Sequence, residues 1–362
     1  MLVDRPRADD GVLTAAEAAT APCIGCAAPC CRFLPLETFG FATLLDLDYA
    51  RWLLGFHGIE LAVTPDGLWH AFLRADCRFL DPATAACTVH GTPQQPHVCA
   101  TYDAHRCWYR GALGPDVGES LLRIDRRRLE HVAERCAFDA ERRLVAVPAW
   151  DELVAAFAEL PLEPTAPSPP PASPAPAVDD GALVGFDDVQ DPCDGCAAWC
   201  CTTLLFDYHR PDTAAGLDHV RFVLGFPGVE VVVGDDRWGL AVRTRCRHLE
   251  GTRCGLYGDP RRPLRCGSYD AWQCFYVPLF TTPRRLRITL ADFDAVVGAV
   301  RFTRDGAVAE LPDVATLSER VAAARRTRQQ RDTAPARRLL PLLASAPGGC
   351  GRADQGVAPV DG

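Results

Sequence analysis

The chain has 362 residues, 48% of them hydrophobic and 23% charged, which is the composition of a globular protein with about two domains. There is no lysine, and 38 arginines face 47 acidic residues, so the net charge is −9. Nucleic acids and anionic membranes attract basic surfaces. We therefore expect neither a nucleic acid nor a membrane as a partner.

The N-terminal segment, residues 1–20, is acidic and has no apolar core, so it lacks the pattern of a secretory signal. No later stretch is long and apolar enough to suggest a membrane span. We expect a cytoplasmic protein, in which thiols stay reduced. The first residues, 1–15, are expected to be disordered.

The first half of the chain mixes helix and strand signals. A helix is predicted over Leu44–Leu54, because acidic residues near its start suit the helix dipole. Strands are predicted at residues 60–63 and 69–74, from an apolar run and an alternating pattern. A loop over residues 77–87 has a cysteine at each end. A second helix is predicted over residues 151–160.

A proline-rich stretch divides the chain. It begins PLEPTAPSPPPASPAP at Pro161, which favours an extended spacer over helix or sheet. We assign residues 161–181 to a linker between two domains, residues 16–160 and 182–328, and expect each domain to fold by itself. The arginine-, proline- and glycine-rich end, residues 329–362, is predicted to be a disordered tail.

The second half repeats the same signals in the same order. A helix is predicted over Leu217–Leu224, strands at residues 230–233, 238–243 and 286–290, and a final helix over residues 314–326. Apolar residues at the end of each repeated helix are expected to be core residues: Leu54, Phe56, Leu224 and Phe226. The glycines beside them are expected to end the helix and turn the chain: Gly55, Gly58, Gly225 and Gly228.

Sixteen of the 18 cysteines form two sets of eight with the same order and nearly the same spacing, each opening with C-x2-C-x3-C-C. The first set is Cys23, Cys26, Cys30, Cys31, Cys77, Cys87, Cys99 and Cys107. The second set is Cys193, Cys196, Cys200, Cys201, Cys246, Cys254, Cys266 and Cys274. Because thiolates bind soft and borderline metals well, we interpret each set as a metal-binding cage.

The cysteines leave several metal arrangements open. Eight thiolates suit two four-coordinate sites, a small polynuclear cluster, or one site with four spare cysteines. Zinc and a 4Fe–4S cluster both accept four cysteines, so zinc and iron stay open, whereas Mg²⁺ and Ca²⁺ are poor choices. The adjacent pair Cys30 and Cys31 is expected to point in different directions and to chelate one ion poorly. A disulfide framework is disfavoured in a long cytoplasmic chain.

Other residues near the cysteines are weaker candidates. Tyr102 and Tyr269, each followed by an aspartate, can orient a metal shell or form a packed turn. Arginines beside both sets can offset thiolate charge or can be ordinary surface residues. They are Arg32, Arg74, Arg78, Arg106, Arg243, Arg245, Arg247, Arg253 and Arg265.

Four further residues are interpreted as non-ligands. When the halves are aligned, His90 and His97 match a tyrosine and a leucine, so neither is a shared ligand. Cys136 and Cys350 have no counterpart in the other half.

The motifs resemble the bacterial YkgJ-like cysteine cluster proteins, also called the CxxCxxCC family. The resemblance rests on the opening cysteine block, a later cysteine pair, and P-x-x-C-x-x-Y before the last cysteine, at Pro96 to Tyr102 and Pro263 to Tyr269. It spans most of both halves, although family members often carry a single copy. The resemblance implies a zinc- or iron-chelating domain. Some members are labelled iron–sulfur oxidoreductases, and flagellin lysine N-methylases look similar over this cluster.

We expect an α+β protein built from two tandem, loop-rich, metal-stabilised cysteine-cage domains. One hypothesis is a zinc- or iron-binding protein, with iron–sulfur included, that has a redox, metal-handling or accessory role. The alternative is a non-catalytic module in which zinc staples a surface that binds a protein partner. The sequence leaves open whether the protein is an enzyme.

Overall fold

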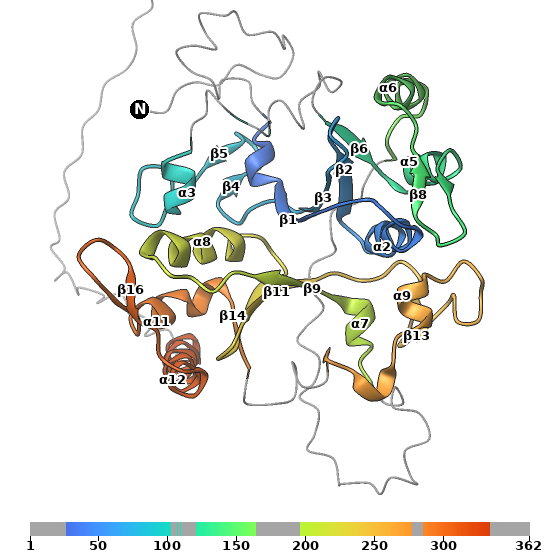
Figure 1. Ribbon diagram of the computed structural model, residues 1–362. Coiled ribbons are helices and arrows are strands. Elements are labelled where there is room, and N and C mark those ends of the chain that lie inside the picture. Colours follow the sequence, from blue (N-terminus) through green and yellow to red (C-terminus); the bar gives the residue numbers. More distant parts are fainter. Residues whose placement is uncertain are drawn as a thin grey trace, which may run out of the picture.

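The computed structural model describes residues 27–102, 107, 109, 121–163, 196–276 and 285–333, and these form an α+β protein (Figure 1). The expected fold class is therefore confirmed at the level of α+β. Helix α12, Val314–Thr333, includes five residues that we had assigned to the tail. None of the helices in the described ranges is long and apolar enough to cross a membrane.

The first half is built on a four-stranded antiparallel sheet with the order β1-β3-β2-β6. Its strands are β1 (Phe33–Phe39), β2 (Ile59–Val63), β3 (Trp69–Arg74) and β6 (Leu122–Ile124). Its helices are α2 (Leu44–Leu54), α3 (His97–Ala100), α5 (Arg126–Ala133) and α6 (Trp150–Glu159), with a 3-10 turn η1 (Pro29–Cys31). Short hairpins pair β4 (Leu80–Asp81) with β5 (Ala86–Cys87) and β7 (Ala137–Phe138) with β8 (Leu144–Ala146).

The second half has a sheet of the same topology, β9-β11-β10-β14. Its strands are β9 (Thr203–Tyr208), β10 (Val229–Val233), β11 (Trp238–Arg243) and β14 (Leu286–Ile288). Its helices are α7 (Trp199–Thr202), α8 (Ala214–Leu224), α9 (Leu264–Gly267), α11 (Phe293–Val297) and α12, with 3-10 turns η4 (Ala271–Gln273) and η5 (Leu290–Asp292). Its hairpins pair β12 (Leu249–Glu250) with β13 (Arg253–Cys254) and β15 (Arg301–Phe302) with β16 (Val308–Glu310).

The local sequence explains the repeated helix and its turn. Thr43 and Thr213 cap the N-termini of α2 and α8, each accepting a hydrogen bond from a backbone N–H of the first turn. Both helices end at a glycine, as predicted. Gly58 and Gly228, three residues later, have φ values of 72° and 80°, which glycine adopts without steric cost. The chain turns there into β2 and β10.

The sequence did not indicate strand β1. Pro35 lies inside it, and a proline normally argues against a strand because it cannot donate to the ladder. β1 is an edge strand, and its register shifts between Pro35 and Glu37, so the missing donor is tolerated.

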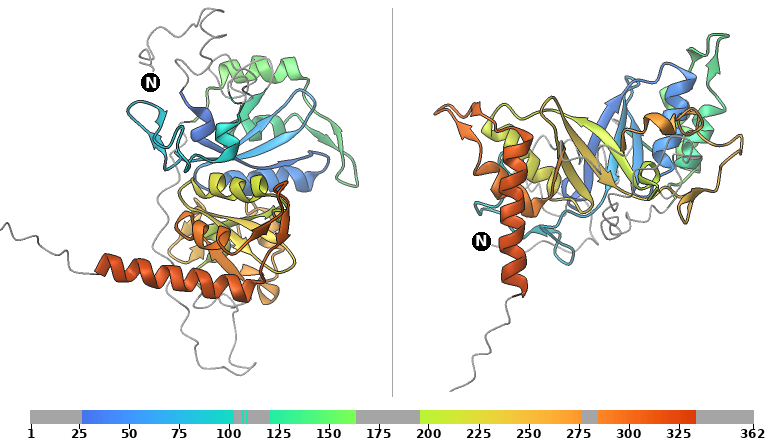
Figure 2. Two further views of the ribbon diagram at one scale, coloured as in Figure 1. Left: turned by 90° about the vertical axis from the view of Figure 1, so that its left-hand side faces the viewer. Right: turned by 90° about the horizontal axis from the view of Figure 1, so that it is seen from below.

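One hydrophobic core contains side chains of both halves. The same cluster of buried side chains contains Leu34 and Phe56 of the first half and Phe226 and Leu317 of the second. Helices α2 and α8 lie in the layer between the two sheets (Figures 1 and 2). Each half is a thin sheet with few helices, so its apolar face is covered partly by the other half.

The contacts between the halves are reciprocal. The N–H of Arg247 donates to the carbonyl of Gly55 at 2.8 Å, and the N–H of Arg78 donates to the carbonyl of Gly225 at 2.8 Å. These are equivalent positions of the repeat, so the same segment of each half binds the helix end of the other. The repeat therefore packs as an internal dimer with an isologous interface.

Candidate functional site

The duplicated cysteines lie on equivalent elements. Cys30 and Cys31 lie in η1 and Cys200 and Cys201 in α7, directly before the first strand of each sheet. Cys77 and Cys246 follow β3 and β11, and the remaining described cysteines lie on short elements or just beyond them: Cys87 in β5, Cys254 in β13, Cys99 in α3, Cys266 in α9, Cys107 and Cys274. Four separated segments of each half thus bring their thiols toward the end of its sheet.

Backbone hydrogen bonds hold these segments together in the same way twice. The N–H of Cys77 donates to the carbonyl of Cys31 at 2.7 Å, and the N–H of Cys246 donates to Cys201 at 2.7 Å. The ends of the variable loop are tied by a strand pair, at Leu80 with Cys87 and at Leu249 with Cys254. The loop can change length at its tip while the cysteines stay in place.

A strained alanine precedes each adjacent pair of cysteines. Ala28 and Ala198 both have φ of 54°, in the left-handed region that costs a residue with a Cβ about 1–3 kcal/mol. The N–H groups of Cys31 and Cys201 donate to the carbonyls of these alanines, at 2.9 and 2.8 Å. Strain that is kept at the same point of both halves indicates that the sharp turn before the thiols has a use.

Within each half the thiols are close enough to affect one another. In the first half, burial raises the pKa of Cys99 to about 12, and the charges of Cys30, Cys77 and Cys87 add to this. In the second half, burial raises the pKa of Cys266 to about 12, with charge effects from its neighbouring thiols. The sequence prediction that the sixteen cysteines gather in two sets is consistent with this placement for those that are described.

The adjacent cysteines do not point away from each other as we expected. A hydrogen bond from Cys201 lowers the pKa of Cys200 to about 7, and the same bond raises the pKa of Cys201. The corresponding bond with Cys30 raises the pKa of Cys31. The tight turn of η1 and α7 brings neighbouring side chains together, so in the second half Cys200 loses its proton more readily than Cys201.

All fourteen cysteines within the described ranges are half-buried and lie outside disulfide bonds. Yet nowhere in these ranges do three Cys, His, Asp or Glu side chains converge closely enough to hold a metal ion. Cys23, Cys26 and Cys193, three of the predicted ligands, lie outside the described residues. The thiol-rich donor set fits zinc or iron–sulfur chemistry, whereas a closed set of ligands is not formed by the described part of the chain.

The two tyrosines contact the last cysteine of each set. The hydroxyl of Tyr269 donates to Sγ of Cys274 at 3.0 Å, and that of Tyr102 donates to Sγ of Cys107 at 3.4 Å. Both contacts are of the kind that an orienting role beside a metal shell would use.

Each set is also braced by the other half, a feature that the sequence did not indicate. Asp48 in α2 accepts hydrogen bonds from the N–H groups of Leu264 and Arg265, at 2.9 and 3.1 Å, at the start of the helix that carries Cys266. Asp218 in α8 accepts the N–H of His97, at the start of the helix that carries Cys99. The two aspartates occupy equivalent positions of the repeat. The only hint of this bracing in the sequence was an aspartate at the same place in both predicted helices.

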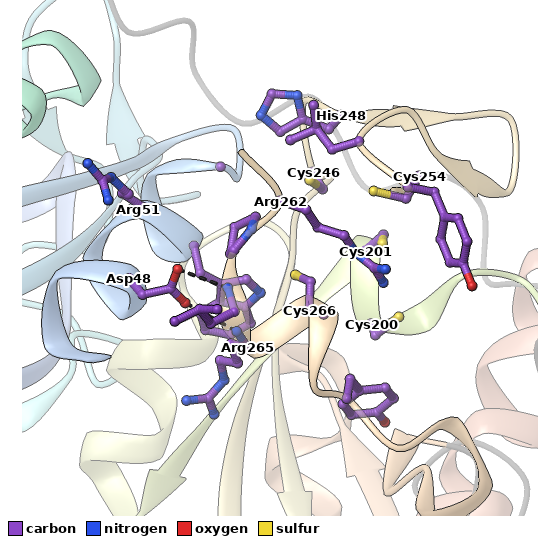
Figure 3. A pocket seen from close by; sticks show the side chains of 18 of the residues that line it. Asp48, Arg51, Cys200, Cys201, Cys246, His248, Cys254, Arg262, Arg265 and Cys266 are labelled. Atoms are coloured by element: carbon purple, nitrogen blue, oxygen red, sulfur yellow. Dashed lines mark hydrogen bonds between the residues drawn. The ribbon is translucent and has the colours of Figure 1, made fainter. Parts of the chain in front are cut away.

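A cavity of about 1430 Å³ lies beside the cysteines of the second half (Figure 3). Its wall includes Cys196, Cys200, Cys201, Cys246, Cys254 and Cys266. The opposite wall comes from the first half, through Asp48, Arg51 and Trp52 of α2 and Arg126 of α5. The cavity is therefore completed by both halves.

The arginines around the cysteines differ in what they do. Arg32 forms an ion pair with Asp76 at 3.0 Å, and Arg74 forms one with the buried Glu60 at 3.3 Å. The guanidinium of Arg265 lies over the rings of Tyr49 and Trp52, 4.9 and 4.7 Å from their centroids. Arg265 thus links the halves, and Arg262, which we had not singled out, is the arginine that acts on the Cys200 and Cys266 thiols.

The predicted non-ligands have different surroundings where they are described. Cys136 packs against the hydrophobic core, and burial raises its pKa. His90 lies near the side chain of Gln95, 3.4 Å from its Nε2 atom. Cys350 lies outside the described residues.

Comparisons of this chain with protein-family models, with curated proteins and with solved structures find no match. The resemblance to the cysteine cluster proteins therefore rests on the motifs alone.

Proposed function

We propose that each half of the protein binds a thiolate-ligated metal centre, zinc or iron, through its duplicated cysteines. The observation that carries this proposal is that half-buried thiols from four separated segments gather in each half. Half-buried thiols that raise one another's pKa are costly to ionise together, and a cation among them removes that cost. The two-domain, metal-stapled organisation belongs to the same proposal.

The described ligands would be the cysteines that share the electrostatic environment of each half. In the second half these are Cys200, Cys201, Cys246, Cys254 and Cys266, with Cys196 and Cys274 at the edge of the group. Cys193 is proposed to complete the set, as Cys23 and Cys26 are in the first half. When bound, zinc would cross-link these segments, and an iron–sulfur cluster would supply one-electron chemistry.

A purification under anaerobic conditions with metal analysis tests the proposal. We expect bound zinc, or iron with sulfide and a brown colour, in amounts that show a centre in each half. Cys201→Ser and Cys31→Ser should each remove the metal of their own half, because a hydroxyl is a poor replacement for a thiolate. Cys136→Ser is the matched control and should keep the full amount. Equal loss in all three variants would contradict the proposal.

The second candidate function is a zinc-stapled interaction module without catalytic activity. Its specific support is structural, since the thiol segments also make the contacts between the halves. Colourless protein with bound zinc, and unfolding on chelation, would favour this function; an iron–sulfur cluster that can be reduced without unfolding would favour a redox role.

A further inference from the structure

The cavity of the second half has a charge opposite to that of the whole protein. Six arginines and one histidine line it, against three residues with carboxylates, in a chain whose net charge is −9. The carboxylates are already engaged: Glu130 pairs with Arg51, and Asp48 and Asp270 accept backbone N–H groups. Arg261 pairs with Asp259, which leaves four of the six arginines without an ion pair among the described residues. An excess of positive charge in a concave site attracts anions.

Arg262 is the cation best placed to receive an anion. Its Nε atom is buried without a hydrogen-bond partner among the described residues, and no carboxylate in these ranges forms an ion pair with it. Its guanidinium lies 4.7 Å from the ring of Tyr257, and Figure 3 shows its side chain reaching across the cavity toward Cys201. A buried guanidinium edge that lacks an acceptor is costly, so the site is incomplete as it stands.

The rim of the same cavity exposes large aromatic rings. Tyr257 is 80% exposed, Trp272 58% and Phe275 50%, and all three line the cavity. Aromatic rings beside an arginine form a surface for a planar group, through stacking and cation–π contacts. The volume of about 1430 Å³ exceeds the roughly 300–1,000 Å³ of common small-molecule sites, so a ligand and a metal centre fit side by side.

The first half keeps a large aromatic residue at one equivalent position, Trp108 for Phe275, and differs at the others. Gln95 stands where the second half has Arg262, and His90 where it has Tyr257. Gln95 lies beside His90 in the first half, and Arg262 lies beside Tyr257 in the second. The same two positions are therefore in contact in both halves, but only the second half has an arginine and a tyrosine there. The halves therefore differ at the arginine and at two of the three rings that a ligand would contact.

We propose that the cavity of the second half binds a small organic anion that has a planar ring. Arg262 holds the negative charge of this ligand, and Tyr257, Trp272 and Phe275 contact its ring. The thiol cluster forms the floor of the site, so the ligand lies beside the proposed metal centre. The anion site does not depend on the metal centre, which matters only because the bound ligand would lie next to it.

The test uses two dyes that differ in charge, 1-anilinonaphthalene-8-sulfonate and the uncharged N-phenyl-1-naphthylamine, with the full chain. We expect one sulfonate dye per chain, bound more weakly as salt is raised. Arg262→Gln introduces the residue found in the first half. It should lower the affinity for the sulfonate dye about tenfold and leave the affinity for the uncharged dye unchanged. Arg304→Gln removes a charge at an exposed position away from the cavity and should change neither.

Equal affinity of wild type and Arg262→Gln for the sulfonate dye would overturn the inference. So would an equal loss of both dyes, which would show an apolar surface only, or no binding of the sulfonate dye. Metal content is measured on the same samples. If Arg262→Gln loses metal and keeps the dye, Arg262 is a counter-ion of the metal centre and the inference fails. If no sample contains metal but the dye depends on Arg262, the proposed metal function fails and the anion site stands.

Discussion

The two halves of this protein share a scaffold and differ at its rim. Sheet order, the strained alanine, the Cys-to-Cys backbone bond and the bracing aspartate occur in both. Arg262, Tyr257 and Trp272 of the cavity lining are replaced in the first half by Gln95, His90 and His105. The shared features hold thiols together, as the proposed metal centre of each half requires. The different features lie where a ligand would contact the protein, so they are explained by one half having taken on recognition.

The comparison also shows that the halves depend on each other. Each cysteine set is braced by an aspartate of the other half, the cavity of the second half has walls from both, and one core contains residues of both. A duplicated unit that packs in this way cannot lose one copy without exposing the apolar face of the other.

The largest expected effect comes from the matched pair Phe56 and Phe226, which are 1% and 0% exposed and lie in the shared core. Phe56→Ala and Phe226→Ala should each lower the free energy of unfolding by about 3–5 kcal/mol, because each leaves a cavity. Chemical denaturation should show one transition in which both halves unfold together. Two transitions, with only the mutated half affected, would show that the halves are independent after all.

A smaller effect is expected from the bracing aspartates. Asp48→Ala should lower the free energy of unfolding by about 1.5–3 kcal/mol, because it removes a charged acceptor from two backbone N–H groups. Its local consequence should appear in the other half, as faster alkylation of Cys266 than of Cys99. Asp218→Ala is the matched variant and should reverse this order. Mass-spectrometric mapping of alkylated cysteines gives both rates; a change confined to the mutated half would contradict the reciprocal bracing.

The smallest effect is expected from a change of pH, on the rates at which two cysteines are alkylated. In metal-free protein the pKa of Cys200 is lowered to about 7, whereas that of Cys136 is raised by burial. A lowered pKa means that Cys200 is largely thiolate above pH 7 and loses this form as the pH falls below 7. Alkylation at pH 7.5 (about half a unit above that pKa) should therefore modify Cys200 before Cys136, and the difference should shrink on acidification. Equal rates at neutral pH would show that the Cys200–Cys201 bond does not stabilise the thiolate.

Much of the scaffold was predictable because its signals are local. The helix Leu44–Leu54 is capped by Thr43, and the strands Trp69–Arg74 and Trp238–Arg243 lie where the alternating pattern placed them. β1 was missed because Pro35 is tolerated only at a sheet edge, which the sequence does not reveal. The joined core and the Asp48 and Asp218 braces were missed because they join residues far apart in the chain. Arg262 was missed because its role depends on a cavity that is lined by residues of both halves.

The most direct test of the central claim is a map of thiol reactivity over all 18 cysteines of native, unoxidised protein, before and after a chelator. The account predicts that the sixteen duplicated cysteines, including Cys23, Cys26 and Cys193, are mostly protected until the chelator removes metal. Cys136 should react at the same slow rate in both states, because core packing protects it. A folded, metal-free protein in which the sixteen cysteines react freely from the start would contradict the account.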